Sequence, residues 1–506
     1  SDLVYSVFIC RKKRNLYLFC IMIGKIERGG KNMATNNRLG HEKISKLLFA
    51  LAIPSIIAQL VNILYNIVDR IYIGQMTDGT SAMAALSVAL PILTFITAFT
   101  QLVGIGGAPL CAIKLGEQRK DKAEEIMTNS FVLLIVVGIL LTIVVLIWQE
   151  PLLLLFGANE ETLSQAISYI SIYALGTIFV QITLGMNAYI NTQGFAKTGM
   201  CTVVIGAIFN IVLDPIFIFW LDMGVAGAAL ATIISQGVSA VWVLIFLFGK
   251  KSTIKIRKQY LKPNWHICLS IMALGISPFV QTATESLLQI SFNNQLLIYG
   301  GTMAVATMAI LMSLWQFITL PLQGLCQGAQ PIMSYNYGAK NYTRVRNTFK
   351  LVMKVCLGFA FIASGTVMLF SEFFVSIFSN DAQTIVFSSW ALRVFLIGSG
   401  MFGAQIACQQ SFMALGQAKV SVWMAITRKI ILLIPLIYIF PYLLGGSSLA
   451  TSIAGPIASM VHDGSRVFAV LFAEPVSDIL AAIITTFMFI RFYKKELKQP
   501  DQIIED

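Results

Sequence analysis

Three carboxylates, Asp69, Asp214 and Glu285, lie inside long apolar stretches of this chain. A carboxylate that is removed from water must take up a proton or bind a cation, because an isolated buried charge is strongly unfavourable. Reversible exchange of a proton or a sodium ion is therefore the chemistry that these residue types could perform. We treat all three as candidates for coupling the movement of an ion to the movement of another molecule.

The amino-terminal half places polar side chains on one stripe of its first apolar segment, at positions i, i+3, i+7 and i+10: Gln59, Asn62, Asn66 and Asp69. Such a stripe must face protein or water, not lipid. A later segment carries Asn210 and Asp214 on one helical face. Pro215 follows and leaves the carbonyl of Ile211 without its usual helical partner. Thr232, on the next segment, supplies a hydroxyl if the two helices are neighbours.

The second half has similar stripes, with Gln281, Glu285, Gln289 and Asn293 at intervals of four and a further set at Gln316, Gln323, Gln327 and Gln330. Amides of this kind often serve only to hold membrane helices together. The functional interpretation is a substrate cavity, lined by Gln59, Asn62, Asn66, Gln281, Gln289 and Gln323. Arg428 and Lys429 also lie within an apolar run. We expect them to face a cytoplasmic cavity or to pair with an acid rather than to bind substrate.

The elements that must position these side chains are membrane helices. The chain is 57% hydrophobic and only 12% charged, with a mean hydropathy of +0.77. About twelve apolar segments are long enough to span a bilayer, and hydrocarbon forces each spanning segment to satisfy its backbone as a helix. The long continuous runs do not fit a membrane β-barrel, whose strands alternate. The predicted fold class is an all-α integral membrane protein.

An internal repeat divides the chain. Phe95-Ile96-Thr97 recurs 222 residues later as Phe317-Ile318-Thr319, and the same offset relates further positions: Gln101 to Gln323, Gly106 to Gly328, Pro109 to Pro331, Gly116 to Gly338 and Gly176 to Gly398. A register held through prolines and glycines predicts two pseudo-symmetric six-helix lobes with corresponding bends. Secondary transporters are commonly built from such repeats, with substrate held between them.

The net charge of +12 is distributed by loop. Basic clusters follow the second, sixth and eighth segments, whereas acidic residues occupy the loops after the third, fifth and ninth. The positive-inside rule then places both termini in the cytoplasm and argues against a nucleic-acid partner. The predicted organisation is a cytoplasmic segment at 1–45, an N-lobe at 46–249, a basic linker at 250–265, a C-lobe at 266–493 and a tail at 494–506.

The first 32 residues differ from the rest. Their apolar stretches are interrupted by Arg11-Lys12-Lys13-Arg14 and are too short to span. Glu-Arg-Gly-Gly-Lys-Asn before Met33 can be encoded almost entirely by purines, as a translated bacterial ribosome-binding site would be. We therefore expect Met33 to be the native start, with an amphipathic surface anchor as the alternative.

Enzyme chemistry has little support in the sequence. The eight cysteines are scattered without paired spacing, and the three histidines are dispersed, so neither a zinc site nor a disulfide framework is indicated. A P-loop, which an ATP-driven pump would need, is lacking. We expect no enzyme activity and no cofactor beyond the coupling ion.

The residues resemble the multidrug and toxic compound extrusion (MATE) transporters over about Lys46 to Tyr493. The resemblance depends on four stretches: LAIPSIIAQLVNILYNIVDRIYIGQM at Leu51 to Met76, NIVLDPIFIF at Asn210 to Phe219, PLQGLCQGAQPIMSYNYGAKNY at Pro321 to Tyr342 and GQAK at Gly416 to Lys419. It implies a V of two six-helix lobes. It also implies an N-lobe cation site at Asp69, Asn187, Asn210, Asp214 and Thr232, with Glu285 matching an acid on the seventh span. Where some members carry an aspartate on the tenth span, this chain has Gln405, Gln409 and Gln410.

The resemblance implies a secondary antiporter in a bacterial inner membrane. It would export amphipathic, cationic organic compounds in exchange for protons or sodium, with sodium held at Asp69 and Asp214. Its partners would be small-molecule substrates and the lipid bilayer, and we expect a monomer. A flippase or exporter of a lipid-linked or secondary metabolite shares the architecture and is the alternative. A channel or membrane enzyme fits less well.

Overall fold

The computed structural model describes residues 35–76, 79–457 and 460–502. Over these ranges the regular structure is helical, without a strand. The expected start at Met33 and the segment before it lie outside the described residues. The predicted all-α class is confirmed, because the long apolar segments satisfy their backbone groups within helices.

The N-lobe contains α3 to α9. Their bounds are α3 Ile44–Gly74, α4 Gly79–Gly116, α5 Lys120–Leu155, α6 Glu160–Leu175, α7 Thr177–Thr192, α8 Ala196–Pro215 and α9 Gly224–Phe248. The helices α6 and α7 form one bent span, with a 55° change of direction at Gly176. After Pro215, α8 continues into a short π-helix, η1 (Ile216–Trp220), before the chain turns into α9.

The C-lobe contains α10 to α18. Their bounds are α10 Trp265–Gly338, α11 Tyr342–Leu369, α12 Ser371–Ser376, α13 Ala382–Leu396, α14 Ser399–Ala414, α15 Ala418–Ile426, the π-helix η3 Thr427–Leu433, α16 Ile434–Leu443, α17 Ser448–Ala454 and α18 Gly464–Phe492. Here α13 and α14 form a bent span of 46°. The break falls at Gly398, which the 222-residue offset pairs with Gly176, so the two lobes bend at corresponding positions.

The 74-residue helix α10 is two spans in succession. Gly301 has φ 69° and ψ −163°, a conformation that side chains disfavour, and the chain reverses there. The described residues contain nine helices long and apolar enough to span, and two bent pairs raise that number to eleven. Because α10 supplies a second span, the expected total of about twelve is confirmed.

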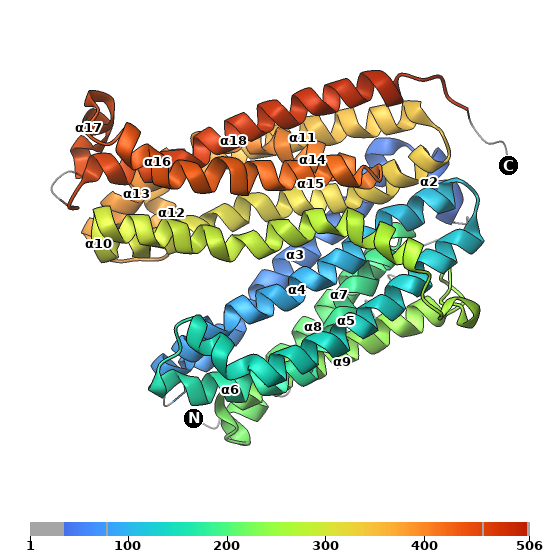
Figure 1. Ribbon diagram of the computed structural model, residues 1–506, viewed down its shortest axis with the longest axis horizontal. Coiled ribbons are helices and arrows are strands. Elements are labelled where there is room, and N and C mark those ends of the chain that lie inside the picture. The colour runs from blue at the N-terminus through green and yellow to red at the C-terminus, as the bar shows by residue number, and fades with distance from the viewer. Residues whose placement is uncertain (1–34, 77–78, 458–459, 503–506) are drawn as a thin grey trace, which may run out of the picture.

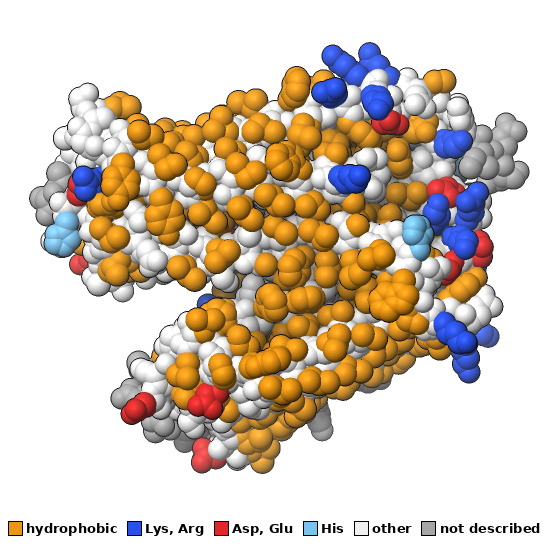
Figure 2. Space-filling model, in the orientation of Figure 1, with side chains coloured by type: hydrophobic (Ala, Val, Ile, Leu, Met, Phe, Trp, Pro, Cys, Tyr) orange, Lys and Arg blue, Asp and Glu red, His pale blue; other side chains and the backbone are white. Residues whose placement is uncertain are grey.

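The two lobes form a V (Figure 1). They diverge at the ends that carry α6 and α17, and they meet near the short helix α2 (Thr35–His41). Glycines let the backbones touch at the closed end. A Cβ on Gly116 would collide with the carbonyl oxygen of Tyr335, and one on Gly338 would collide with that of Ile113. Figure 2 shows most Lys and Arg gathered at this closed end.

The segment between the lobes is tied to the N-lobe. The side-chain Oε1 of Gln193 accepts hydrogen bonds from the Thr253 backbone N–H at 2.8 Å and from the Ser252 hydroxyl at 3.0 Å. Arg257 donates through Nε to Glu124 at 2.7 Å, and the backbone N–H of Asn264 donates to Asn129 at 2.7 Å. The basic linker predicted at 250–265 is therefore an ordered strap rather than a loose connection.

Candidate functional site

The two aspartates of the N-lobe lie close together in its interior. Asp69 on α3 is 9% exposed and Asp214 on α8 is fully buried. The two side chains are near enough to repel each other electrostatically when both are ionised. Tyr65 and Tyr169 also lie within electrostatic range of both acids. The packing of α8 against α3 thus concentrates negative charge that a cation or proton would relieve.

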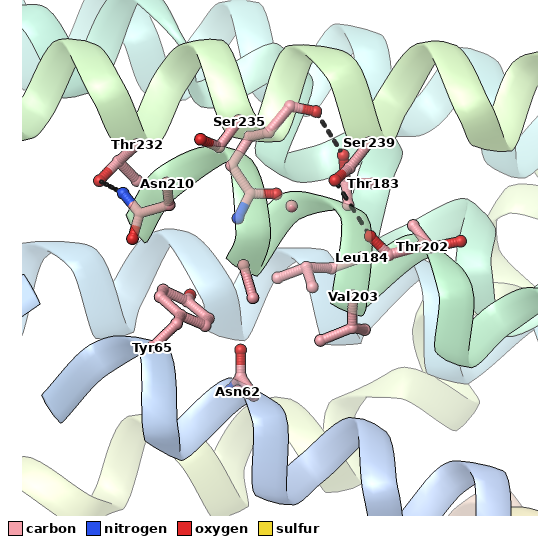
Figure 3. Close-up of a pocket in the computed structure, with 13 residues that line it drawn as sticks. Asn62, Tyr65, Thr183, Leu184, Thr202, Val203, Asn210, Thr232, Ser235 and Ser239 are labelled. Atoms are coloured by element: carbon pink, nitrogen blue, oxygen red, sulfur yellow. Dashed lines mark hydrogen bonds between the residues drawn. The ribbon is translucent and has the colours of Figure 1, made fainter. Parts of the chain in front are cut away.

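Asn210 links this pair to the neighbouring helix. Its side-chain Nδ2 donates to Asp214 Oδ1 at 3.1 Å and to the Thr232 hydroxyl on α9 at 3.4 Å, the latter drawn in Figure 3. The i, i+4 spacing of Asn210 and Asp214 and the side-by-side packing of α8 and α9 produce this geometry. The helices α8 and α9 are therefore neighbours, as a contact between Asn210 and Thr232 requires.

Three buried oxygens in this group lack a hydrogen-bond partner: Oδ1 of Asp69, Oδ2 of Asp214 and Oδ1 of Asn210. Buried oxygen atoms of this kind are normally satisfied. Carboxylate and amide oxygens are hard ligands, so a small monovalent cation would suit them, and a proton on either carboxyl would reduce the repulsion. These three oxygen ligands suit the exchangeable proton or sodium ion that the sequence predicts.

A small cavity lies beside Asn210 and Thr232. Figure 3 shows Asn62 and Tyr65 on α3 facing it from one side, with Thr232 and Ser235 on α9 opposite. Such a hydroxyl- and amide-lined space within the lobe can hold water next to the buried acids.

A larger cavity lies between the lobes. Four of the six predicted substrate-cavity residues line it: Gln59, Asn62, Gln281 and Gln323. Asn66 and Gln289 are exposed and do not line either cavity. Each lies farther along its helix than the residues of the same stripe that line the cavity. Helical spacing alone therefore could not distinguish the lining residues from the others. Two hydrogen bonds cross between the lobes here, from Gln59 to Gln327 at 3.3 Å and from Thr282 to Gln101 at 3.0 Å.

Two predicted cation-site residues lie apart from the aspartate pair. Asn187 lines the central cavity and donates to the Gly199 carbonyl oxygen at 3.2 Å. Glu285 lines the same cavity from the C-lobe and forms a salt bridge with Lys429. The structure therefore brings together Asp69, Asn210, Asp214 and Thr232, and it places Asn187 and Glu285 on the lining of the central cavity.

Sequence reasoning missed several functional candidates. Gln101, Asn191 and Gln410 line the central cavity. The repeat was the available signal for Gln101, because the 222-residue offset pairs it with Gln323. Glu474 and Asp478 on α18 were also missed. They form an i, i+4 pair within an apolar helix, and both form salt bridges with Arg428. The expectation that Arg428 and Lys429 would pair with acids is confirmed.

Two bundles of six spans, related by an internal repeat and enclosing a polar cavity, define a secondary transporter. A sequence profile for the MatE family matches residues 54–216 and 279–439, one match in each lobe. The chain belongs to the MatE family, and so it is a multi-pass membrane transporter rather than an enzyme.

Curated relatives agree with this assignment, and solved structures share the fold. The chain is 28% identical over 403 residues to the multidrug export protein MepA of Staphylococcus haemolyticus, covering 79% of this chain and 88% of the relative. It is 26% identical to MepA of Staphylococcus aureus over the same shares. A MATE structure in the bent conformation superposes with a TM-score of 0.82 at 23% identity, covering 92% of this chain and 99% of that one. An outward-facing multidrug resistance MATE transporter gives the same score and identity.

Proposed function

We propose that the protein exports amphipathic organic compounds by antiport, with inward movement of a proton or a sodium ion at Asp69 and Asp214. The observation that carries this proposal is the set of three unpaired buried oxygens on Asp69, Asp214 and Asn210. A set of buried oxygens that a proton or a cation would satisfy has a direct use in coupling and little use in holding helices together. The names of the MepA relatives support export of several drugs.

The central cavity suits an amphipathic substrate. Amides from both lobes line it together with Met200, Met413 and Ile105, so that one part of a ligand can form hydrogen bonds while another contacts apolar groups. Glu285 is the charged residue in this lining, and it provides the negative charge that a cationic substrate would seek. We take the closed, basic end as cytoplasmic and the V as open outward, in a bacterial inner membrane.

Coupling requires the ion and the substrate to prefer different states of the protein. Ion entry between α3 and α8 would remove the repulsion between Asp69 and Asp214 and change how these helices pack. Gln59 and Asn62 lie on α3 and line the central cavity, so repacking of α3 alters the substrate site directly. We propose that the ion-bound N-lobe holds substrate weakly and releases it to the outside.

The test is efflux from proteoliposomes under separately imposed proton and sodium gradients. A fluorescent organic cation serves as the substrate, and Asp69→Asn is compared with wild type. Gradient-driven transport that the substitution abolishes supports antiport and identifies the ion. Asp222→Asn is the matched control, because Asp222 is exposed in the turn before α9. Transport that ignores both gradients, or that survives Asp69→Asn, rejects the coupling role and favours a flippase.

A further inference from the structure

A second group of ionisable side chains lies in the C-lobe, away from the proposed ion site. It contains three acids and two bases from three elements: Glu285 on α10, Arg428 and Lys429 on η3, and Glu474 and Asp478 on α18. Arg428 donates to Glu474 and to Asp478, each at 2.9 Å, and its guanidinium lies 4.7 Å from the centre of the Phe402 ring. Arg428 is thus fixed on three sides.

The salt bridge between Lys429 and Glu285 is uneven in its burial. The Lys429 side chain is 3% exposed, whereas that of Glu285 is 59% exposed and lines the central cavity. The Lys429 ammonium also donates to the Gln281 carbonyl oxygen at 2.5 Å. Lys429 therefore reaches from inside the lobe to the carboxylate that the cavity presents. An organic cation that enters the cavity finds the charge of Glu285 already neutralised.

Lys429 has a second carboxylate within electrostatic range. Glu474 lies within electrostatic range of both Lys429 and Glu285. Oδ2 of Asp478 is buried without a hydrogen-bond partner. When all five groups are ionised, the cluster carries one more negative charge than positive. An ammonium that left Glu285 would otherwise be a costly unpaired buried charge, but the excess carboxylate on α18 can receive it.

We propose that Lys429 is a tethered cation that competes with cationic substrates for Glu285, and that Glu474 and Asp478 hold it when a substrate takes its place. The five-residue cluster then binds one organic cation without stranding a charge. This inference rests on the proposed export function for its use in the cell, but the competition itself is a binding equilibrium. It assigns to Lys429 the role of setting how strongly the cavity prefers cations.

The same competition can be driven by a proton. If Glu474 or Asp478 takes up a proton, the excess negative charge of the cluster disappears, and Lys429 is left with Glu285 as its partner. The organic cation is then displaced, so one proton enters the cluster as one monovalent cation leaves and the total charge is unchanged. The neighbouring helices α14 and α16 carry no Asp, Glu, Lys, Arg or His, and Arg393 on α13 pairs with Glu372 instead.

The test is equilibrium binding to the purified full-length protein in nanodiscs, with no gradient. The probes are a fluorophore bearing a trimethylammonium group and its uncharged tert-butyl isostere. Lys429→Met should raise affinity for the cation at least about tenfold, equivalent to about 1.4 kcal/mol, and leave the isostere unchanged. Glu474→Gln removes the excess carboxylate and should lower cation affinity. Lys419→Met, an exposed lysine on α15, is the control and should change neither.

The double variant Lys429→Met with Glu474→Gln decides between competition and a purely structural role. If Lys429 competes with the cation, the double variant should bind the cation as tightly as Lys429→Met alone. If Glu474→Gln instead damages the structure, the double variant should retain the weakened cation binding. Unchanged or weaker cation binding by Lys429→Met would overturn the proposal, as would an equal rise for the isostere. Failure of the proposed function would instead appear as wild-type protein without gradient-driven efflux, with this binding series intact.

Discussion

At the scale of single residues, the lobes manage their buried charge differently. In the N-lobe, Asp69 and Asp214 form no salt bridge with a basic side chain of the described residues, whereas in the C-lobe Arg428 and Lys429 form salt bridges with all three acids. An acid without an internal cation must obtain its counter-charge from solution. We therefore place the coupling-ion site in the N-lobe, and in the C-lobe the substrate competition that protonation of Glu474 or Asp478 can drive.

This assignment predicts that the coupling ion stabilises the folded protein through Asp214. Melting of wild type in detergent should respond to sodium, or to protons if they are the coupling ion. Sodium at ten times its dissociation constant would add about 1.4 kcal/mol. Asp214→Asn should melt independently of that ion, because the amide cannot supply the negative charge. An unchanged response in Asp214→Asn, with Asp222→Asn as the matched comparison, would place the ion elsewhere.

At the scale of elements, the breaks in the helices influence the positions of the candidate functional residues more than the helix lengths do. Gly176 and Gly398 bend equivalent spans, and Pro215 ends α8 one residue beyond Asp214. The π-helix η3 presents the consecutive residues Arg428 and Lys429 to α18 and to α10. Irregular helical turns of this kind are often found at functional sites, and here η3 carries the two buried bases of the C-lobe cluster.

The reversal within α10 gives a direct test of the importance of these helix breaks. Gly301→Ala forces a side chain into the conformation at φ 69° and ψ −163° and should cost about 1–3 kcal/mol, measured as a lower thermal midpoint. Nothing lies within 4 Å of a Cβ built on Gly301, so strain rather than a clash would be the cause. Gly365→Ala is the control, because its Cβ also meets nothing and its backbone is helical. Equal stability of the two variants would contradict the argument.

At the scale of the whole molecule, the V is held by close contacts at one end. Besides Gly116 and Gly338, a Cβ on Gly275 of α10 would collide with the carbonyl oxygen of Leu102 on α4. The strap at 250–264 is bonded to Gln193, Glu124 and Asn129 of the N-lobe, so it should move with that lobe. If the lobes rock, we expect them to turn about the start of α10, where the strap ends.

We predict that Gly116→Ala shifts the population of molecules away from the V-shaped conformation, because the added methyl group separates α4 from Tyr335. Spin labels at Ser164 on α6 and Ser448 on α17, both exposed, would report the width of the open mouth by pulsed electron paramagnetic resonance. The substitution should shorten the mean distance between the labels. Gly358→Ala meets no neighbour and should leave it unchanged. If Gly116→Ala changes the distance between the labels no more than Gly358→Ala does, the contact between Gly116 and Tyr335 does not hold the lobes together.

The membrane environment, the helical class, the repeat and one face of each polar helix could be predicted from the sequence without a structure. These properties depend on composition and on periodicity along one chain segment, which is why the i, i+4 spacing alone was enough to pair Asn210 with Asp214. The resemblance to MATE proteins also pointed to Asp69 and Thr232 as their neighbours.

Which helix faces meet became known from the folded structure. Glu285 has no basic residue near it in the sequence, yet Lys429, 144 positions away, pairs with it. Asn187 and Asn66 could not be placed by spacing, because their positions depend on how neighbouring helices bend and rotate. Contacts between distant segments arise from the packing of whole lobes, and a local pattern contains no record of that packing.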